Sequence, residues 1–378
     1  MRRKFHRLGV QLPCRGAETT TLDTLFPILI LKTGALGDVV RTTALVPGLR
    51  SAHSDARITW VTAPGAVDLV RLHPGVAEVV ALDARAEASC AAVRTRLSST
   101  RWAWVISLDD EEPLCALASA LDAERLSGAH HDAMRRRVYT PDVGPWFDMG
   151  LLSIHGKEEA DRRKIANRRS HPEILTSMLG LPMGKPELHV EPRHIEAARA
   201  FAERHGLWAH GPVVGLNTGA GGRWRSKMLS VERTVELALR VQQALSGAVT
   251  FILFGGADER ERNQRIVAAC EGRVRLVDAG VENALLDFAA RVGLCDVLVT
   301  SDSLALHVGL ARGVRIVSFF APTSAAEIEL YDLGEKVVST APDYCSYKPD
   351  ADTSSLTPEH IADATLRQLA LAPSRRPR

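Results

Sequence analysis

Residues Ile28 to Asp38 read ILILKTGALGD, and the fold class of the chain follows from this stretch. Four apolar residues, Ile28 to Leu31, form a short run of the kind that a fully buried parallel strand needs. A tight turn containing Gly34 and Gly37 follows, and residues 39–49 have the pattern of a helix. Such a turn points backbone N–H groups and the helix dipole outward at the carboxyl end of a sheet, where open α/β proteins bind ligands.

Asp38 is the one carboxylate in this turn. Its position makes it a candidate general base, because a carboxylate at the carboxyl end of a strand can meet a bound ligand. The same position also favours an aspartate that caps the helix N-terminus. The segment alone leaves both interpretations open.

Length and composition limit the class of protein. The 378 residues suggest two domains, and 24% charged with 46% hydrophobic residues is typical of a globular protein. The net charge of +2 indicates no strong attraction to nucleic acid or to an anionic membrane, and no apolar run is long enough for a membrane span. The six cysteines are scattered without a C-x-x-C pair, which argues against a zinc site or a disulfide framework and favours the cytoplasm.

Short apolar runs alternate with helical patterns in two series, which predicts two parallel sheets. The proline-rich residues 182–192 read as a linker between them. Residues 1–25 are basic but lack the apolar core of a secretory signal, so we expect a flexible extension. The expected domains are residues 26–185 and 194–371. The expected strands are residues 28–31, 57–62, 76–82, 104–108, 213–216, 249–254, 274–276, 297–300 and 316–320.

Two segments of the first half do not follow the alternation. Asp109 to Glu112 form an acidic cluster after a strand, either lining a cleft or lying in a solvated loop. Residues 127–169 are basic and weakly periodic, and we interpret them as an irregular segment that covers a site. Their arginines either form a solvated face or contact an anionic acceptor.

Polar loops follow four strand ends of the second half. They read NTGAGGRWRSK (217–227), GGADERE (255–261), TSDSLALH (300–307) and FFAPT (319–323). Small residues let the backbone approach a phosphate, and Lys227 supplies a compact positive charge. Four such loops at successive strand ends predict a nucleotide diphosphate ligand. His307 is equally well explained as a hydrogen-bonded helix residue.

With these motifs together, the chain resembles glycosyltransferase family 9, the ADP-heptose glycosyltransferases typified by the lipopolysaccharide heptosyltransferases. The resemblance runs from about residue 28 to about residue 369. It rests on KTGALGD with the downstream Pro47, on the loop that ends in Lys227, and on GGADE, DSLALH and FAPT. Two positions depart from the family pattern, since Leu304 and Ala321 stand where glycines are usual.

The resemblance implies a GT-B fold, in which two Rossmann-like domains face each other across a cleft. It implies an inverting transferase that needs no metal or other cofactor, with an acceptor-binding first domain and a nucleotide-sugar-binding second domain. Asp38 would be the general base that activates the acceptor hydroxyl. The residues expected to bind the donor are Thr218, Lys227, Glu259, Asp302, Ser303, His307 and Thr323, with backbone contributions from Gly34, Gly37 and Gly219. Among them, Lys227 would contact the diphosphate and Glu259 the ribose.

The resemblance also sets the expected partners. The donor would be an ADP-activated heptose, and the acceptor a hydroxyl on a glycan, a natural product or a protein. Three alternatives remain: a transferase that uses another nucleotide-hexose, a nucleotide-sugar hydrolase or epimerase, and a non-catalytic nucleotide-sugar-binding protein.

Overall fold

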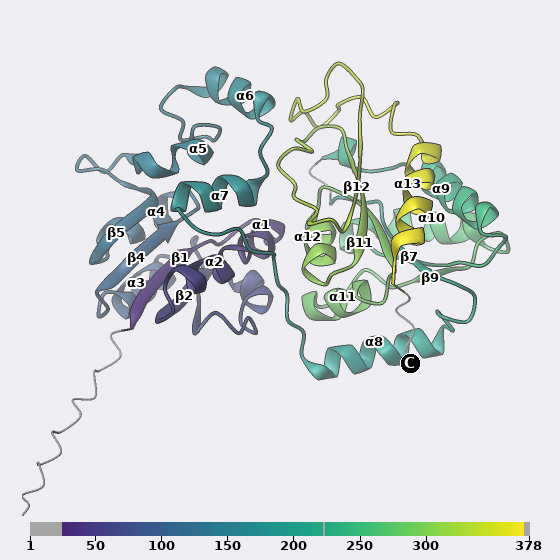
Figure 1. Ribbon diagram of the computed structural model, residues 1–378, viewed down its shortest axis with the longest axis horizontal. Helices are drawn as coiled ribbons and strands as arrows, with labels where there is room; N and C mark the ends of the chain where they lie inside the picture. Colours follow the sequence, from purple (N-terminus) through teal and green to yellow (C-terminus); the bar gives the residue numbers. More distant parts are fainter. Residues whose placement is uncertain (1–24, 222–223, 374–378) are drawn as a thin grey trace, which may run out of the picture.

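The computed structural model describes residues 25–221 and 224–373, and these form two α/β lobes that lie side by side (Figure 1). Each lobe contains one six-stranded sheet. The expected N-terminal extension lies outside the described residues, apart from Leu25. No helix in residues 25–221 or 224–373 is long and apolar enough to cross a membrane.

The sheet of the first lobe has the strand order β3-β2-β1-β4-β5-β6 and is parallel except for the β5–β6 pair. Its strands are β1 (Phe26–Leu31), β2 (Ala56–Thr62), β3 (Glu78–Ala81), β4 (Trp102–Ser107), β5 (Ala123–His131) and β6 (Arg137–Tyr139). Both faces of β1 are buried, because Ile28 and Ile30 join one apolar cluster while Leu29 and Leu31 join another. The order changes direction between β1 and β4, which puts the turn after β1 at a switch point where α/β proteins bind ligands.

Helices cover both faces of this sheet. They are α1 (Leu36–Thr42), α2 (Leu45–Ala52), η1 (Pro64–Leu69), α3 (Glu87–Leu97), α4 (Glu112–Ala120), η2 (Pro141–Val143), α5 (Gly144–Phe147), α6 (Lys157–Ala166) and α7 (His171–Leu179). The single helix expected over residues 39–49 is in fact two helices, α1 and α2. Pro47 explains the break, because in a continuous helix its ring would clash with the carbonyl of Thr43.

The expectation of an irregular segment over residues 127–169 is wrong in part. The segment contains the end of β5, all of β6, and the helices η2, α5 and α6. The sequence pattern did not predict strand β5, because burial does not alternate along it. Ser127, Gly128 and Ala129 are buried in succession, while both ends of the strand are more exposed.

The sheet of the second lobe has the order β12-β11-β10-β7-β8-β9 and is parallel throughout. Its strands are β7 (Val213–Asn217), β8 (Thr250–Leu253), β9 (Leu276–Asp278), β10 (Val297–Ser301), β11 (Arg315–Phe320) and β12 (Gly334–Val338). Its helices are α8 (Pro192–Arg204), η3 (Arg225–Lys227), α9 (Val231–Ala244), η4 (Ala257–Glu259), α10 (Arg260–Cys270), α11 (Leu285–Val292), α12 (Leu304–Ala311) and α13 (Pro358–Leu371). Strand β12 and helix α13 lie beyond the last expected element.

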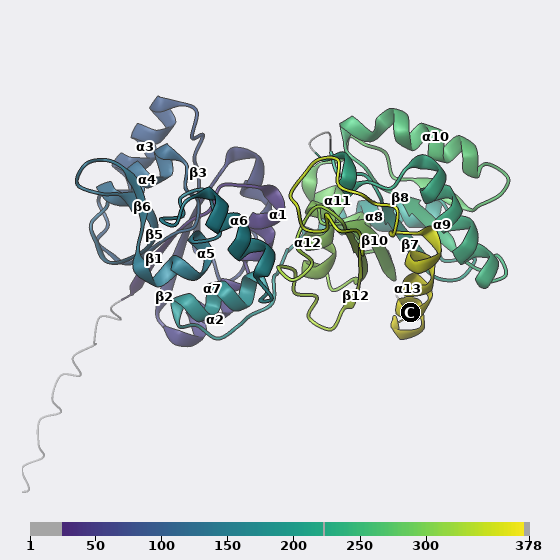
Figure 2. The same ribbon diagram turned by 90° about the horizontal axis from the view of Figure 1, so that it is seen from above.

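The lobes meet where α1 packs against α12 (Figure 2). The helices pack tightly at Gly37, where an added Cβ would lie 2.7 Å from Cδ2 of His307. One apolar cluster runs across this boundary and includes core residues of both lobes. The linker before α8 is tied to the second lobe, since the Arg312 guanidinium donates to the Leu188 carbonyl at 3.2 Å.

Candidate active site

A cavity of about 560 Å³ opens at the carboxyl edge of the second sheet. It is walled by the loops after β7, β8 and β10, by the first turn of α12, and on one side by apolar residues before and within α11. Its lining residues are Asn217, Gly219, Ala220, Gly221, Trp224, Lys227, Gly255, Gly256, Ala257, Asp258, Glu259, Val281, Asn283, Leu285, Phe288, Asp302, Ser303, Leu304 and Ala305. Three of the four loops singled out in the sequence therefore form one cavity.

Lys227 and Asp302 form an ion pair in the wall of this cavity. The Lys227 Nζ lies 2.9 Å from the Asp302 carboxylate and 3.0 Å from the Asp302 carbonyl oxygen. Burial alone would raise the pKa of Asp302, but Lys227, His307 and the Thr323 hydroxyl together hold it below its ordinary value. Asp302 is therefore a carboxylate at neutral pH, and Lys227 is the cation available to a diphosphate.

Glu259 connects two of the glycine-rich loops. Its Oε1 accepts the Gly221 N–H at 2.6 Å, and its Oε2 accepts the Gly256 N–H at 2.7 Å. A Cβ on Gly219 would lie only 2.5 Å from the Glu259 Cγ, so a side chain cannot fit there. The carboxylate thus braces the loops after β7 and β8 while it also lines the cavity.

Thr218 is not among the residues that line the cavity. It is fully buried, and its hydroxyl contacts the Thr234 hydroxyl at 3.0 Å and accepts from Arg262 at 2.7 Å. Burial lowers the pKa of Arg262 to about 10, which still leaves the guanidinium charged at neutral pH. Thr218 therefore stabilises the loop without lining the cavity, whereas its neighbours Asn217 and Gly219 line it.

The first turn of α12 lies at the centre of the site. Ser303 precedes the helix, and its hydroxyl contacts the Thr300 hydroxyl at 3.1 Å. The first N–H groups of a helix have no partner within the helix, so this end can receive an anion. Thr323 and His307 lie behind Asp302, both buried and absent from the cavity lining.

Asp38 occupies the third position of α1, facing the second lobe. Its Oδ2 accepts the Ala35 N–H at 3.3 Å, and its Oδ1 pairs with Arg41 at 2.8 Å. The capping interpretation is therefore correct in part, although the capped residue is Ala35 and Asp38 is not the N-cap itself. A side-chain exposure of 34% leaves Asp38 accessible.

A buried ion pair braces the turn that carries Asp38. Lys32 bonds to the Asp109 carboxylate and to the Gly34 carbonyl, and the Thr33 hydroxyl donates to Asp109 at 2.9 Å. Asp109 is buried, so it does not lie in a solvated loop. The sequence motifs did not identify Lys32 or the role of Asp109, although the acidic cluster after β4 was a signal.

His307 links the two halves of the site. It contacts Gly37 of the first lobe and interacts electrostatically with both Asp38 and Asp302. Burial is the main reason that its pKa falls to about 4, and the Arg41 cation lowers it further. His307 is therefore a neutral imidazole at physiological pH.

Four of the seven arginines in residues 127–169 form ion pairs with carboxylates of the chain. Arg136 pairs with Asp132, while Arg162 and Arg163 pair with Glu159. Lys164 lies 3.8 Å from the centre of the Tyr347 ring in the second lobe. These contacts favour a solvated, internally paired face over a cluster that awaits an anionic acceptor.

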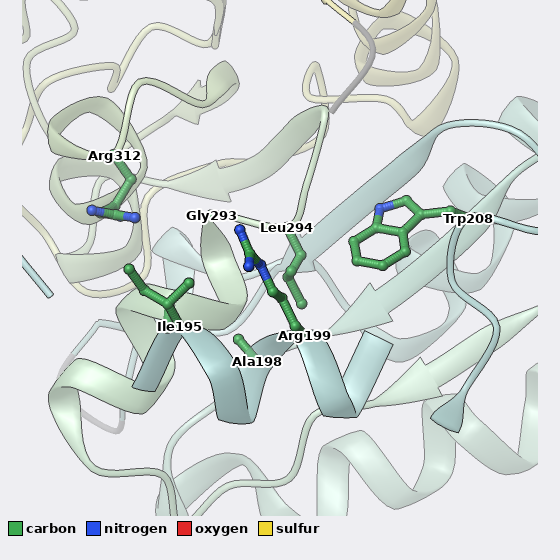
Figure 3. Close-up of a pocket in the computed structure, with 8 residues that line it drawn as sticks. Ile195, Ala198, Arg199, Trp208, Gly293, Leu294 and Arg312 are labelled. Carbon is green, nitrogen blue, oxygen red and sulfur yellow. The ribbon is translucent and has the colours of Figure 1, made fainter. Parts of the chain in front are cut away.

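Two of the smaller cavities are relevant here. One of about 160 Å³ is formed by the loop after β4, by residues of and after α5, and by Lys164 and Glu327. The other, of about 200 Å³, lies between α8 and α11 and is lined by Arg199 and Trp208 (Figure 3). It shares no residue with the cavity at Lys227.

Among residues 25–221 and 224–373, no group of three or more His, Cys, Asp or Glu side chains is arranged to hold a metal ion.

The chain matches the family model described as glycosyltransferase family 9 (heptosyltransferase) over residues 163–356. Among solved structures, a glycosyl transferase family 9 protein from Veillonella parvula is similar, with a TM-score of 0.73, 20% identity, and coverage of 92% of this chain and 98% of that one. The ADP-heptose lps heptosyltransferase II of E. coli has a TM-score of 0.62 at 18% identity, covering 91% and 99%. The E. coli heptosyltransferase WaaC with ADP has a TM-score of 0.56 at 16% identity, also covering 91% and 99%. No curated protein sequence matches the chain.

Proposed function

Because the chain belongs to glycosyltransferase family 9, it is a glycosyltransferase, and we propose that it transfers a heptose from ADP-heptose to the hydroxyl group of an acceptor. The two-lobed α/β architecture is that of the heptosyltransferase structures, which supports a GT-B fold. The observation that carries the proposal is the arrangement of the site. Asp38 of one lobe and the Lys227–Asp302 pair of the other both interact electrostatically with the buried His307.

In the proposed reaction, the Asp38 carboxylate takes the proton of the acceptor hydroxyl. The acceptor oxygen then bonds to the anomeric carbon from the face opposite the diphosphate, which inverts the configuration. The bond between that carbon and the phosphate oxygen breaks, and its electron pair leaves with ADP. The low pKa of Asp38 supports this role, because a base must be ionised before the reaction.

Negative charge grows on the diphosphate as it leaves. We assign Lys227 and the N–H groups at the start of α12 to stabilise that charge, because fixed donors act where charge develops. Asp302, beside Lys227, would bind sugar hydroxyls. The apolar wall that contains Phe288 would receive the base, and Glu259 would contact the ribose or hold the loops that do.

A donor panel tests the proposal. The protein is incubated with ADP-heptose, ADP-glucose and UDP-glucose, and both thermal protection and nucleotide release are measured. ADP-heptose at 100 times its Kd is expected to add about 2.7 kcal/mol to the free energy of unfolding. Stronger protection by a UDP-sugar would overturn the donor assignment. Nucleotide release that no hydroxyl acceptor accelerates would favour a hydrolase.

Asp38→Asn tests the base. The variant keeps the shape of the side chain but lacks a basic oxygen, so we expect a loss of turnover of about 100-fold or more with nearly unchanged ADP affinity. An active Asp38→Asn variant would show that Asp38 is not the general base.

A further inference from the structure

Arg41 is a cation with little solvent exposure beside the proposed base. It lies one turn after Asp38 on α1, and its Nη2 is 2.8 Å from the Asp38 Oδ1. Only 14% of the Arg41 side chain is exposed. A buried arginine loses much of its hydration, so it is retained where its charge and hydrogen bonds have a specific partner.

The other surroundings of Arg41 are aromatic and uncharged. Its guanidinium carbon lies 5.6 Å from the centre of the Trp146 ring, and the His171 ring packs edge-on against Trp146 at 4.7 Å. Burial, and then the Arg41 charge, lower the pKa of His171 well below its ordinary value, so His171 is neutral. Within the described part of the chain, Asp38 is the acidic ion-pair partner of Arg41, and the Arg41 Nε is buried without a hydrogen-bond partner.

The pair makes the two oxygens of Asp38 unequal. Oδ1 is held by Arg41 at 2.8 Å, whereas Oδ2 accepts one long hydrogen bond of 3.3 Å from the Ala35 N–H. We propose that Arg41 is a positioning residue, which anchors Asp38 through Oδ1 so that Oδ2 is free to take the acceptor proton. This inference rests on the proposed function, because it concerns the orientation of the proposed base.

Other charged groups near Asp38 do not replace Arg41. Lys32, directly after β1, is already bonded to Asp109, and His307 of α12 and His171 of α7 are neutral at physiological pH. Burial raises the pKa of Asp38, but Arg41, followed by Lys32, His307 and the Ala35 N–H, lowers it further than burial raises it. Arg41 therefore makes the Asp38 carboxylate a weaker base, but it also fixes that carboxylate in position and keeps it fully ionised.

The test uses Arg41→Gln and Arg41→Lys, with Arg240→Gln as the matched control. Arg240 forms an exposed ion pair with Glu236 on α9, remote from the site. Two quantities are measured: the pKa of Asp38, by ¹³C NMR of labelled aspartate assigned with Asp38→Asn, and the release of ADP from ADP-heptose with water as acceptor.

In Arg41→Gln, we expect the pKa of Asp38 to rise by about one unit or more, because burial then raises this pKa without the opposing effect of the Arg41 charge. The acid limb of the kcat profile should move to higher pH with it. We expect kcat at neutral pH to fall roughly 10- to 100-fold, the usual consequence of a misplaced reacting group, with little change in KM for ADP-heptose. Arg41→Lys should keep the pKa low and restore part of kcat, and Arg240→Gln should change nothing.

The outcomes separate this inference from the proposed function. Full activity of Asp38→Asn would refute the assignment of Asp38 as the general base. An inactive Asp38→Asn together with an Arg41→Gln variant of normal kcat and unshifted Asp38 pKa would refute only the role of Arg41. Should Arg41→Gln fail to fold, Arg41→Lys decides, because wild-type kcat in that variant would show that the arginine geometry is not needed.

Discussion

Replacing Glu259 by glutamine tests whether the nucleotide cavity depends on the brace between its two glycine-rich loops. In the native chain, one carboxylate accepts the Gly221 N–H at 2.6 Å and the Gly256 N–H at 2.7 Å. The glutamine side chain has the same length but a single acceptor oxygen. It can satisfy one N–H, and it presents an NH₂ group to the other.

The size of the effect follows from those two bonds. A hydrogen bond to a charged group contributes about 1.5–3 kcal/mol, and a neutral one about 1 kcal/mol. Glu259→Gln loses one charged bond and weakens the other, so the loop arrangement should lose roughly 2–3 kcal/mol. Because the same loops bound the cavity, we expect ADP affinity to fall by about 30- to 150-fold at 25 °C.

Isothermal titration calorimetry with ADP and with 2′-deoxy-ADP measures the effect and identifies its cause. A brace acts on both ligands, so the loss should be equal for the two. A direct bond from Glu259 to the 2′-hydroxyl predicts instead that the loss disappears with 2′-deoxy-ADP. Glu261→Gln is the control, because Glu261 is exposed two residues further along the chain. ADP affinity within twofold of wild type in Glu259→Gln would refute the brace.

Three further predictions concern the lobe boundary and the charges of the site. Lys227→Gln should weaken ADP binding by roughly 10- to 100-fold through the loss of a charged hydrogen bond, measured by calorimetry, and unchanged affinity would contradict the phosphate role. Gly37→Ala places a Cβ 2.7 Å from His307, which should cost about 1–3 kcal/mol and separate the lobes. X-ray scattering of this variant should then give a larger radius of gyration, and an unchanged radius with an unchanged Tm would contradict the prediction. Finally, the pKa of His307 falls from 6.5 to about 4 on folding, so the unfolded state binds more protons between those values. The free energy of unfolding should therefore decrease as pH falls from 6.5 to 4, by up to about 3 kcal/mol from this group, and His307→Gln should reduce that slope in urea titrations.

The fold was predictable because buried parallel strands must be apolar on both faces. Runs such as ILIL in β1 and VTFILF around β8 show this directly in the sequence. Edge strands carry a weaker pattern, because one side of each meets solvent. Strand β5 is not an edge strand, but β6 pairs with it only over residues 129–131, and its exposed and half-buried ends are largely polar, so its pattern in the sequence is also weak.

The candidate site was predictable where its residues belong to recognisable loops that follow strands of one sheet, and less so elsewhere. The loop that ends at Lys227 and the loop that contains Asp302 were expected to share a site, and these two residues form an ion pair. The Lys32–Asp109 pair joins residues 77 positions apart, and although Asp109 belongs to the acidic cluster after β4, no local pattern identifies Lys32 as its partner. The Thr218 hydroxyl was expected to face a ligand, but Arg262 and Thr234 occupy it.

The contact between Lys227 and Asp302 pairs the ammonium group in the cavity wall with a carboxylate before any ligand enters. In the proposed reaction, the donor would compete with that carboxylate for the ammonium group, and a nucleoside without phosphates would have no charge with which to do so. The two phosphates of the donor would draw the ammonium group away, and the carboxylate would then be free to bind the sugar. The diphosphate that leaves in the proposed reaction would thus be the same group that breaks the ion pair on binding.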